Sequence, residues 1–359
     1  MSRLKPSVFL WLAGLALLPA MLAGLLLGPV TIPFSALVDG LSNGFSIADS
    51  GASVAPELQR QWLILSAIRL PRMLLAALVG ACLAICGAAM QGLFRNPLAD
   101  PSLIGVSAGA SAGASFVIVF AGGWLQAGHG NEALGLSLLA GGAFGGGFIA
   151  VLVVYRLASS ASGPLSRGTS VATMLLAGIA ISALAGACNS ALSFVADNDM
   201  LRRISLWQMG RLDGANGLRV ALAGLALVVI VAGLVSQSRA LNALLLGESE
   251  ARFLGVNVEQ LKRRVVLLTA LGVGVSVAVA GAIAFVGLVV PHIVRLLIGP
   301  DHRFLLPGSA LIGALLLVLA DALSRVIVAP AELPVGIVTA LLGVPFFFSL
   351  LLRQRTRVA

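Results

Sequence analysis

The sequence predicts an all-α fold, a polytopic membrane protein with about ten transmembrane helices in a single domain. Two observations support this prediction. Of the 359 residues, 59% are hydrophobic and 10% are charged, whereas soluble domains carry about 25% charged residues. The apolar residues also gather in runs of about 20, the length that crosses a hydrocarbon core of about 30 Å. A soluble globular fold is therefore excluded.

The apolar runs define the expected spans in chain order. They cover residues 8–28, 72–94, 103–122, 134–156, 171–195, 218–236, 265–284, 285–298, 305–324 and 335–352. The seventh and eighth runs are continuous, so hydropathy does not locate the boundary between them. A single kinked span over 265–298 would remove one crossing and would place the two termini on opposite sides of the membrane.

The N-terminus and the distribution of charge predict the orientation. The first run follows Arg3 and Lys5 and is longer than the apolar core of a signal peptide, about 7–15 residues, so we expect an uncleaved span. With both termini in the cytoplasm, 15 of the 23 Lys and Arg residues fall in cytoplasmic segments, as the positive-inside rule predicts. These residues lie in short connections without interleaved aromatics, so the net charge of +9 does not indicate nucleic-acid binding.

Two longer connections are expected on the side opposite the termini. Residues 29–71 are polar and include a stretch rich in Ser, Asp and Gly. Residues 197–217 contain Leu201, Ile204 and Trp207 at helical spacing. This spacing predicts an amphipathic helix on the membrane surface.

A tight turn at 95–101 separates the second and third runs. Its two prolines lack an amide hydrogen and disfavour helix in the preceding residue. After the turn, Gly105, Gly109 and Gly113 recur at every fourth position. They are expected to share one helix face and to let another helix pack closely against it. Generic membrane-helix composition is the alternative explanation.

The sequence carries little catalytic chemistry. It lacks the G-x-x-x-x-G-K-[ST] phosphate-binding loop, so any ATP and Mg²⁺ must be bound by a separate subunit. Cys82 and Cys86 lie one helical turn apart without a histidine, and two thiols alone do not complete a metal site, so we expect no bound metal or cofactor. The scattered histidines lack partnered carboxylates, which argues against an enzyme. Asp321 and Arg325, also one turn apart, are expected to form a local ion pair rather than a proton relay.

The longest cytoplasmic connection, 238–264, contains the sequence GESEARFLGVNVEQLKRR. Charged residues alternate there with apolar ones, and a glycine stands on either side, which predicts a short amphipathic helix. A helix seated in the groove of a soluble partner can transmit rigid-body motion. We therefore interpret 238–264 as a coupling segment, with a solvated loop as the alternative.

Several long sequence motifs carry a resemblance to a known family. They are RLPR (69–72), GAAMQGLFRNPLADPSLIGVSAGA (87–110), GESEARFLGV (247–256), AGAIAFVGLVVPHIVR (280–295), DHRFLLPG (301–308) and AELPVGIVTALLGVPFF (331–347). In this order they resemble the permease subunits of ATP-binding-cassette (ABC) importers of the FecCD type, which move iron chelates, haem and cobalamin. The resemblance implies the permease fold of the cobalamin importer, a bacterial inner-membrane location and no catalytic residue in this chain.

The resemblance also implies partners and site residues. The chain would form a homodimer with the transport path on its two-fold axis, and would act with two ATPase subunits and a periplasmic substrate-binding protein. The implied ATPase-coupling residues are Gly247, Glu248, Glu250, Ala251, Arg252, Leu254 and Gly255. Residues implied to dock the binding protein are Arg69, Arg72 and Arg325, and those implied at the cytoplasmic gate are Ser170, Val171 and Ala172.

The cargo is the least specified expectation. The long 29–71 connection and the sequence motifs as a whole resemble haem-type members of the family most. Cobalamin and ferric siderophores are the alternative cargoes. A nucleotide-independent secondary transporter or channel is the alternative from another functional class. A structural or sensory membrane protein that docks a partner without moving cargo is a further one.

Overall fold

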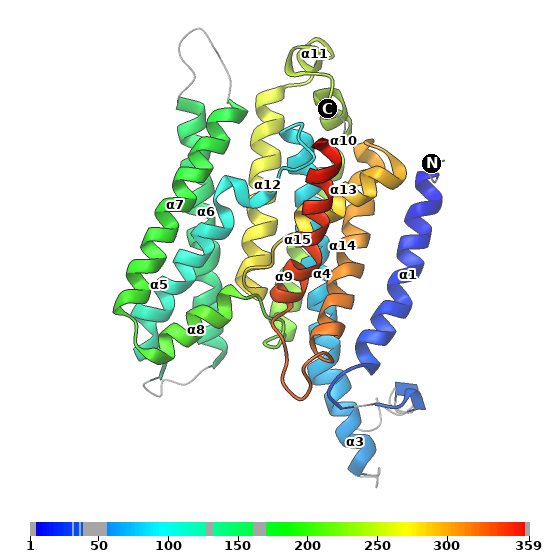
Figure 1. The fold of residues 1–359 in the computed structure, drawn as a ribbon, viewed down its shortest axis with the longest axis vertical. Helices are drawn as coiled ribbons and strands as arrows, with labels where there is room; N and C mark the ends of the chain where they lie inside the picture. Colours follow the sequence, from blue (N-terminus) through cyan, green and yellow to red (C-terminus); the bar gives the residue numbers. More distant parts are fainter. Residues whose placement is uncertain are drawn as a thin grey trace.

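The computed structural model describes residues 5–30, 32–35, 37–38, 56–126, 132–160 and 170–355. These residues form helices and connections, with no β-strand among them. The long helices run roughly along one direction (Figure 1). Such a bundle suits a bilayer, because a helix satisfies its backbone hydrogen bonds internally.

The helices follow one another along the chain in a simple order. They are α1 (Pro6–Leu26), α3 (Pro56–Leu63), the π-helix η1 (Ile64–Arg69), α4 (Leu70–Leu93), the 3₁₀ helix η2 (Pro101–Ile104), α5 (Val106–Gln126), α6 (Glu132–Ser160), α7 (Val171–Val195), α8 (Asn198–Gln208), α9 (Gly217–Ser236), α10 (Ser238–Leu244), α11 (Glu248–Phe253), α12 (Val258–Ala280), α13 (Val286–Ile298), α14 (His302–Ser324) and α15 (Val335–Arg355).

Helix α4 is the centre of the bundle. It is buried along almost its whole length and packs against α9, α12, α13 and α14. Its glycines permit the closest approaches. A Cβ atom added to Gly80 would lie 2.2 Å from the carbonyl oxygen of Gly313, and one added to Gly87 would lie 1.8 Å from that of Gly287. Backbone contact of this kind is the packing that helices use in lipid.

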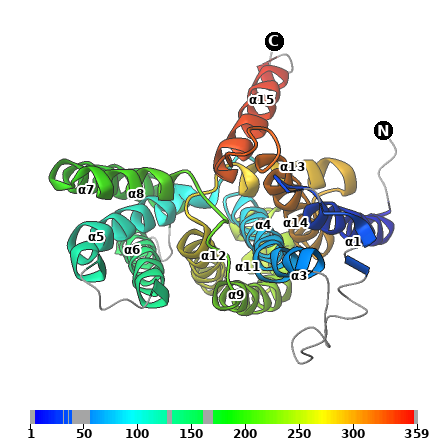
Figure 2. The ribbon, with the colours of Figure 1, turned by 90° about the horizontal axis from the view of Figure 1, so that it is seen from below.

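Helices α5, α6 and α7 form a second group beside this centre (Figure 2). Helix α12 links the two groups because it packs against both α4 and α6. Helix α1 lies at the opposite side, against α14, and α15 contacts α13 and α14. Both described ends of the chain lie at the same end of the bundle as α11 (Figure 1).

The helices fall on the segments that the apolar runs predict. Seven of them are long and apolar enough to cross a membrane, and Val106–Gly122, Val286–Ile298 and Val335–Leu350 are shorter apolar helices. Each expected span contains one of these helices. That all of them cross a membrane, as one domain, stays a prediction. The helix expected within 197–217 is confirmed as α8, which Asp197 caps by accepting a hydrogen bond from the Met200 amide. Its position on a membrane surface stays a prediction.

The connection expected at 29–71 differs from the prediction. Its second part is helical, since α3 and η1 continue without interruption into α4 and give one helix of 37 residues from Glu57 to Leu93. Residues 39–55 lie outside the part of the chain that the structure describes. The helix therefore extends beyond the length that a bilayer core requires.

The boundary between the seventh and eighth runs is an extended link, 281–285. Helix α12 begins at Val258, inside the expected coupling segment, because the Asn257 side chain accepts a hydrogen bond from the Gln260 amide and caps it. The helix ends before Gly281, which has a φ of 72°, and Phe285 has a φ of 68°. Gly281 is the residue at which α12 ends, and Phe285, in the left-handed region, is the residue that precedes α13. Two separate helices, rather than one kinked helix, therefore occupy 258–298.

Candidate functional site

The coupling segment forms two short helices, α10 and α11, at one end of the bundle (Figure 1). Gly247 precedes α11 with a φ of 131°, and Gly255 follows it with a φ of 82°. Few other residues adopt these backbone angles. The two glycines therefore set the entry and the exit of α11, which explains the glycine on either side of the amphipathic pattern.

The tip of α11 exposes large apolar side chains. Phe253 is 91% exposed and Leu254 is 64% exposed, whereas Ala251 is fully buried. Hydrogen bonds from its own amide and from the Ser249 hydroxyl hold the pKa of Glu250 below its ordinary value. Exposed apolar side chains with charged neighbours are typical of a protein interaction site. Five of the expected coupling residues are thus at least partly exposed on α11 or directly after it, whereas Gly247 and Ala251 are buried beneath them.

An ion-pair cluster fastens α11 to α12. The Lys262 side chain is 2% exposed, and its Nζ lies 2.9 Å from Oε2 of Glu248 and 3.4 Å from Oε1 of Glu259. Arg252 Nη2 lies 3.7 Å from the same Glu248 oxygen. We call Glu248, Glu259 and Lys262 the α11 anchor. A buried ammonium with two carboxylates restricts how the first turn of α11 can move relative to α12.

A second set of polar contacts fastens α10 to α14. Asn242 donates from Nδ2 to Oδ1 of Asp301 at 2.6 Å, and its Oδ1 accepts from the His302 amide at 2.9 Å. Burial would raise the pKa of Asp301, but hydrogen bonds from the Arg303 amide and from Asn242 outweigh it and hold the pKa below its ordinary value. Both short helices are therefore attached to long helices of the bundle.

The arginines expected to dock a binding protein are buried in this chain, and their role in docking stays a prediction. Arg69, Arg72 and Arg325 are 4%, 6% and 3% exposed. Each finds its partners inside the chain, so none of them presents a free guanidinium at the surface of this chain. The reason lies in contacts between segments that are distant in sequence.

Two carboxylates compensate Arg72 and Arg325. Arg72 Nε lies 2.8 Å from Oδ1 of Asp321, and its Nη1 lies 2.5 Å from Oε2 of Glu332. Arg325 Nε lies 3.2 Å from Oδ2 of Asp321, so the expected Asp321–Arg325 pair is confirmed. We call Arg69, Arg72, Asp321, Arg325 and Glu332 the arginine cluster. It lies near the α3 end of α4, away from α11 (Figure 1).

The arginine cluster also satisfies the carboxyl end of α1. Arg69 Nη1 donates to the carbonyl oxygens of Leu25 and Leu26 at 2.6 Å and 2.8 Å, and Nη2 donates to that of Val30. Arg325 Nη2 donates to the Gly24 carbonyl oxygen at 2.8 Å. The last carbonyl groups of a helix have no partner within the helix. Two arginines supply those partners here.

The residues expected at the gate start helix α7. The Ser170 hydroxyl accepts a hydrogen bond from the Thr173 amide at 3.3 Å and caps the helix. Val171 is half-buried and Ala172 is exposed. The preceding residues, 161–169, lie outside the described residues, so part of the loop that the prediction concerns has no described geometry.

Of the three packing glycines, two lie on the expected helix. Cβ atoms on Gly109 and Gly113 would lie 2.5 Å and 2.1 Å from the carbonyl oxygens of Gly146 and Gly142, so this face of α5 packs against α6. Gly105 does not share that face, which corrects the prediction. It has a φ of 79° and joins η2 to α5, because the two prolines of the turn delay the start of the helix to Val106.

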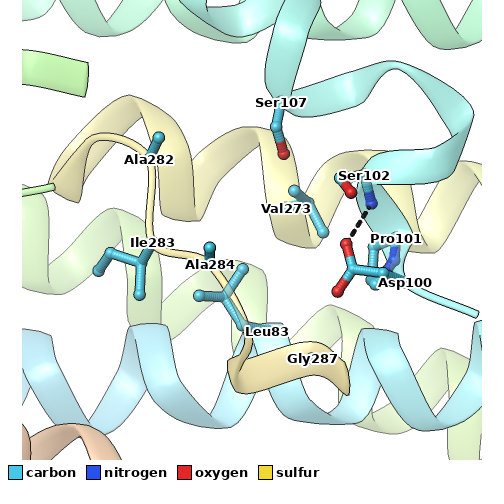
Figure 3. Close-up of a pocket in the computed structure, with 10 residues that line it drawn as sticks. All are labelled: Leu83, Asp100, Pro101, Ser102, Ser107, Val273, Ala282, Ile283, Ala284 and Gly287. Atoms are coloured by element: carbon cyan, nitrogen blue, oxygen red, sulfur yellow. Dashed lines mark hydrogen bonds between the residues drawn. The ribbon is translucent and has the colours of Figure 1, made fainter. Parts of the chain in front are cut away.

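A cavity of about 120 Å³ lies where the 94–105 link meets the 281–285 link (Figure 3). We call it the break cavity. Its lining residues are Leu83, Asp100, Pro101, Ser102, Ser107, Val273, Ala282, Ile283, Ala284 and Gly287. Asp100 was not singled out from the sequence. The signal was present, since an aspartate before a proline in a turn commonly caps a short helix.

Cys82 and Cys86 are both buried in α4. Among the described residues, no group of three or more His, Cys, Asp or Glu side chains could hold a metal ion. The two thiols lie against α12, where each contacts a hydroxyl-bearing side chain, Ser276 or Thr269. Their surroundings are those of packed core residues.

The comparisons with known proteins agree on one class. Residues 15–353 match the FecCD transport family. Over 295 residues the chain is 48% identical to the hemin transport system permease protein HmuU of Yersinia pestis, with 82% of this chain and 84% of the relative covered. Over 288 residues it is 44% identical to the vitamin B12 import system permease protein BtuC of Escherichia coli O9:H4 (strain HS), with 80% and 83% covered.

A solved structure has the same fold over nearly the full length. It is an inward-facing conformation of a metal-chelate type ABC transporter, with a TM-score of 0.80 and 30% sequence identity. The superposition covers 97% of this chain and 100% of the other. The all-α permease fold that the sequence predicts is confirmed.

Proposed function

Because the chain belongs to the FecCD transport family and is a permease subunit of an ABC importer, we propose that it moves haem or another iron chelate across a bacterial inner membrane by alternating access. The 48% identity to a hemin permease supports haem as the cargo. The 44% identity to a vitamin B12 permease keeps cobalamin as the second candidate.

The observation that carries the mechanism is the exposed apolar tip of α11 above the α11 anchor. We propose that each of two ATPase subunits receives this tip in a groove and displaces it when nucleotide binds. The residues in contact or in support would be Gly247, Glu248, Glu250, Ala251, Arg252, Leu254 and Gly255. The Lys262 contacts would then pass the displacement to α12, since a paired buried charge cannot be left behind without a large penalty.

The assembly we propose is a homodimer with both termini and α11 in the cytoplasm. Ser170, Val171 and Ala172 would stand at the cytoplasmic gate, at the start of α7. A periplasmic binding protein would approach the α3 and α8 end. Arg69, Arg72 and Arg325 lie at this end, and we propose that they support its docking surface from within, because they are buried and paired inside the chain. ATP and Mg²⁺ would be bound by the partner ATPase.

Uptake into proteoliposomes tests the proposal. The chain is reconstituted with its ATPase and binding protein, and haem, cobalamin and a ferric siderophore are offered with and without ATP. ATP-dependent accumulation of haem is the expected result. ATP-dependent accumulation of cobalamin alone would show that the cargo is cobalamin, and the chain would still be an importer permease. Equal fluxes with and without ATP would favour a channel or secondary transporter.

A further inference from the structure

Helix α10 is the part of the coupling segment that lies against the bundle. Its Leu241 and Leu244 side chains are buried, and the helix packs against α4, α9, α12 and α14. The contacts of α11 run mainly to α10 and α12. Helix α10 is therefore a direct contact between the coupling segment and the centre of the bundle, separate from the α11 anchor.

The Asn242 side chain of α10 makes three hydrogen bonds to the start of α14. Its Nδ2 donates to Oδ1 of Asp301 at 2.6 Å, and its Oδ1 accepts from the His302 amide at 2.9 Å. The same Oδ1 lies 2.8 Å from Nδ1 of His302. An amide oxygen can only accept, so the proton of the imidazole must be on Nδ1. Both polar atoms of Asn242 are thus used on two consecutive residues of α14.

His302 extends this contact to α4. The residue is 1% exposed, and a Cβ atom added to Gly92 would lie 2.3 Å from its Nε2. The imidazole therefore lies directly against the backbone of the last turn of α4. Among the described residues Nε2 has no hydrogen-bond partner, so the ring is held by Asn242 on one side and by packing against Gly92 on the other.

Helices α4 and α14 are joined along their whole length, and we call them the α4–α14 pair. Midway, a Cβ atom on Gly313 would lie 2.3 Å from the carbonyl oxygen of Gly80. At the far end, Arg72 Nε lies 2.8 Å from Oδ1 of Asp321. Closely packed elements transmit a displacement instead of absorbing it, because a protein interior is barely compressible. The pair thus connects α10 with the arginine cluster at the opposite end of the bundle (Figure 1).

Asn242 is not needed to start α14. Asp301 already caps the helix, because its Oδ1 accepts a hydrogen bond from the Arg303 amide at 3.0 Å. What the Asn242 amide adds is a bond between two helices. It offers a donor to a carboxylate and an acceptor to two N–H groups, and an asparagine is complementary to both.

We propose that Asn242 is a positioning residue that joins the coupling segment to the α4–α14 pair. This role rests on the proposed function, since the displacement comes from the ATPase. When α10 is displaced, the hydrogen bonds of Asn242 move α14, and His302 moves the end of α4 with it. The movement reaches the end of the bundle at which the binding protein approaches. It is a second route beside the Lys262 contacts, which run from α11 to α12.

Uptake per ATP hydrolysed tests this role. The chain is reconstituted in proteoliposomes with its ATPase and binding protein, and uptake of whichever cargo the wild type accumulates is measured together with ATP hydrolysis. Asn242→Asp places a second carboxylate against Asp301. We expect uptake per ATP to fall about 2- to 30-fold, the range for residues that transmit a displacement. A merely structural role would lower uptake and hydrolysis together and leave their ratio unchanged.

A charge swap tests the contact itself. In Asn242→Asp combined with Asp301→Asn, the carboxylate at position 242 still accepts from His302 and the amide at position 301 donates to it, so the ratio should return close to that of the wild type. Asn257→Asp is the matched control. Asn257 is an exposed residue of the same segment that accepts a hydrogen bond from the Gln260 amide, and a carboxylate can accept it equally well.

Asn242→Ala breaks the contacts without adding a charge and should also lower the ratio. A wild-type ratio in both single variants at position 242 would overturn the proposal, as would an equally low ratio in Asn257→Asp or no recovery in the swap. Failure of both single variants to fold would give Asn242 a structural role instead, and would overturn it too. Absence of ATP-dependent uptake of any cargo by the wild type would contradict the proposed function itself.

Discussion

The two ends of the bundle differ in how their charged side chains are buried and paired. At the α11 end, apolar side chains are exposed and one buried lysine lies beneath them, paired with carboxylates that remain partly exposed. At the α3 end, three arginines are buried and their compensation is almost entirely internal. The first arrangement suits a surface that must be covered by a partner, and the second suits a fixed joint between helices. The comparison teaches that arginines near a helix end can link helices inside one chain.

Removing the central carboxylate of the arginine cluster should have the largest effect. Asp321→Asn leaves Arg72 and Arg325 with less compensation in a buried site, and loss of one partner of a buried ion pair costs about 3–5 kcal/mol. We expect a correspondingly lower thermal unfolding midpoint in nanodiscs. The matched control is Glu332→Gln, because the Glu332 side chain is 34% exposed and should cost about 0–1 kcal/mol. Equal shifts of the thermal unfolding midpoint in the two variants would contradict a stabilising role of the buried Asp321 in linking these helices.

Truncating the apolar tip of α11 should weaken a partner contact without affecting the fold. Phe253→Ala should reduce affinity for the ATPase by about 2 kcal/mol, or about 30-fold, as truncation of an interface hot spot does. The measurement is titration of the reconstituted chain with its ATPase. Phe194→Ala is the control, since Phe194 is 90% exposed near the carboxyl end of α7. A similar loss of affinity in both variants would show that removal of any exposed phenylalanine weakens binding, and that the tip of α11 is not the contact.

Removing the buried lysine of the α11 anchor should have the smallest effect, and on coupling rather than on binding. In Lys262→Met the carboxylates of Glu248 and Glu259 remain partly hydrated, so the chain should fold. Residues that transmit a displacement typically change coupling by about 0.5–2 kcal/mol, so uptake per ATP hydrolysed should fall about 2- to 30-fold. Lys262→Arg retains the positive charge and should therefore retain much of the uptake per ATP hydrolysed. Unchanged uptake per ATP in Lys262→Met would exclude the anchor from transmission.

The helices could be predicted from the sequence because runs of about 20 apolar residues have few alternatives in a membrane. The division between α12 and α13 could not, because both sides of the 281–285 link are apolar. The left-handed backbone at Phe285 arises from tertiary packing rather than from local preference. Gly105 was misplaced for a related reason, since spacing along the sequence does not reveal where a helix starts.

The site was predictable only where its signal is local. Gly247 and Gly255 flank α11 within the same short motif, so the short helix and its two ends could be predicted there. The burial of Arg72 depends on Glu332, which lies 260 positions along the chain. Asp100 likewise becomes noteworthy only when the 281–285 link closes a cavity beside it. Contacts between distant segments leave no pattern within either segment.

The bonds from Arg69 to the end of α1 have a consequence for the order of membrane insertion. Helix α1 packs chiefly against α14, which is synthesised near the end of translation, since chains emerge from the N-terminus onward. During most of synthesis α1 therefore lacks its contact with α14. Arg69 follows it closely in the chain and can hold its last carbonyl groups as soon as α4 inserts. We therefore expect the hydrogen bonds of Arg69 to hold α1 beside α4 until α14 packs against both helices.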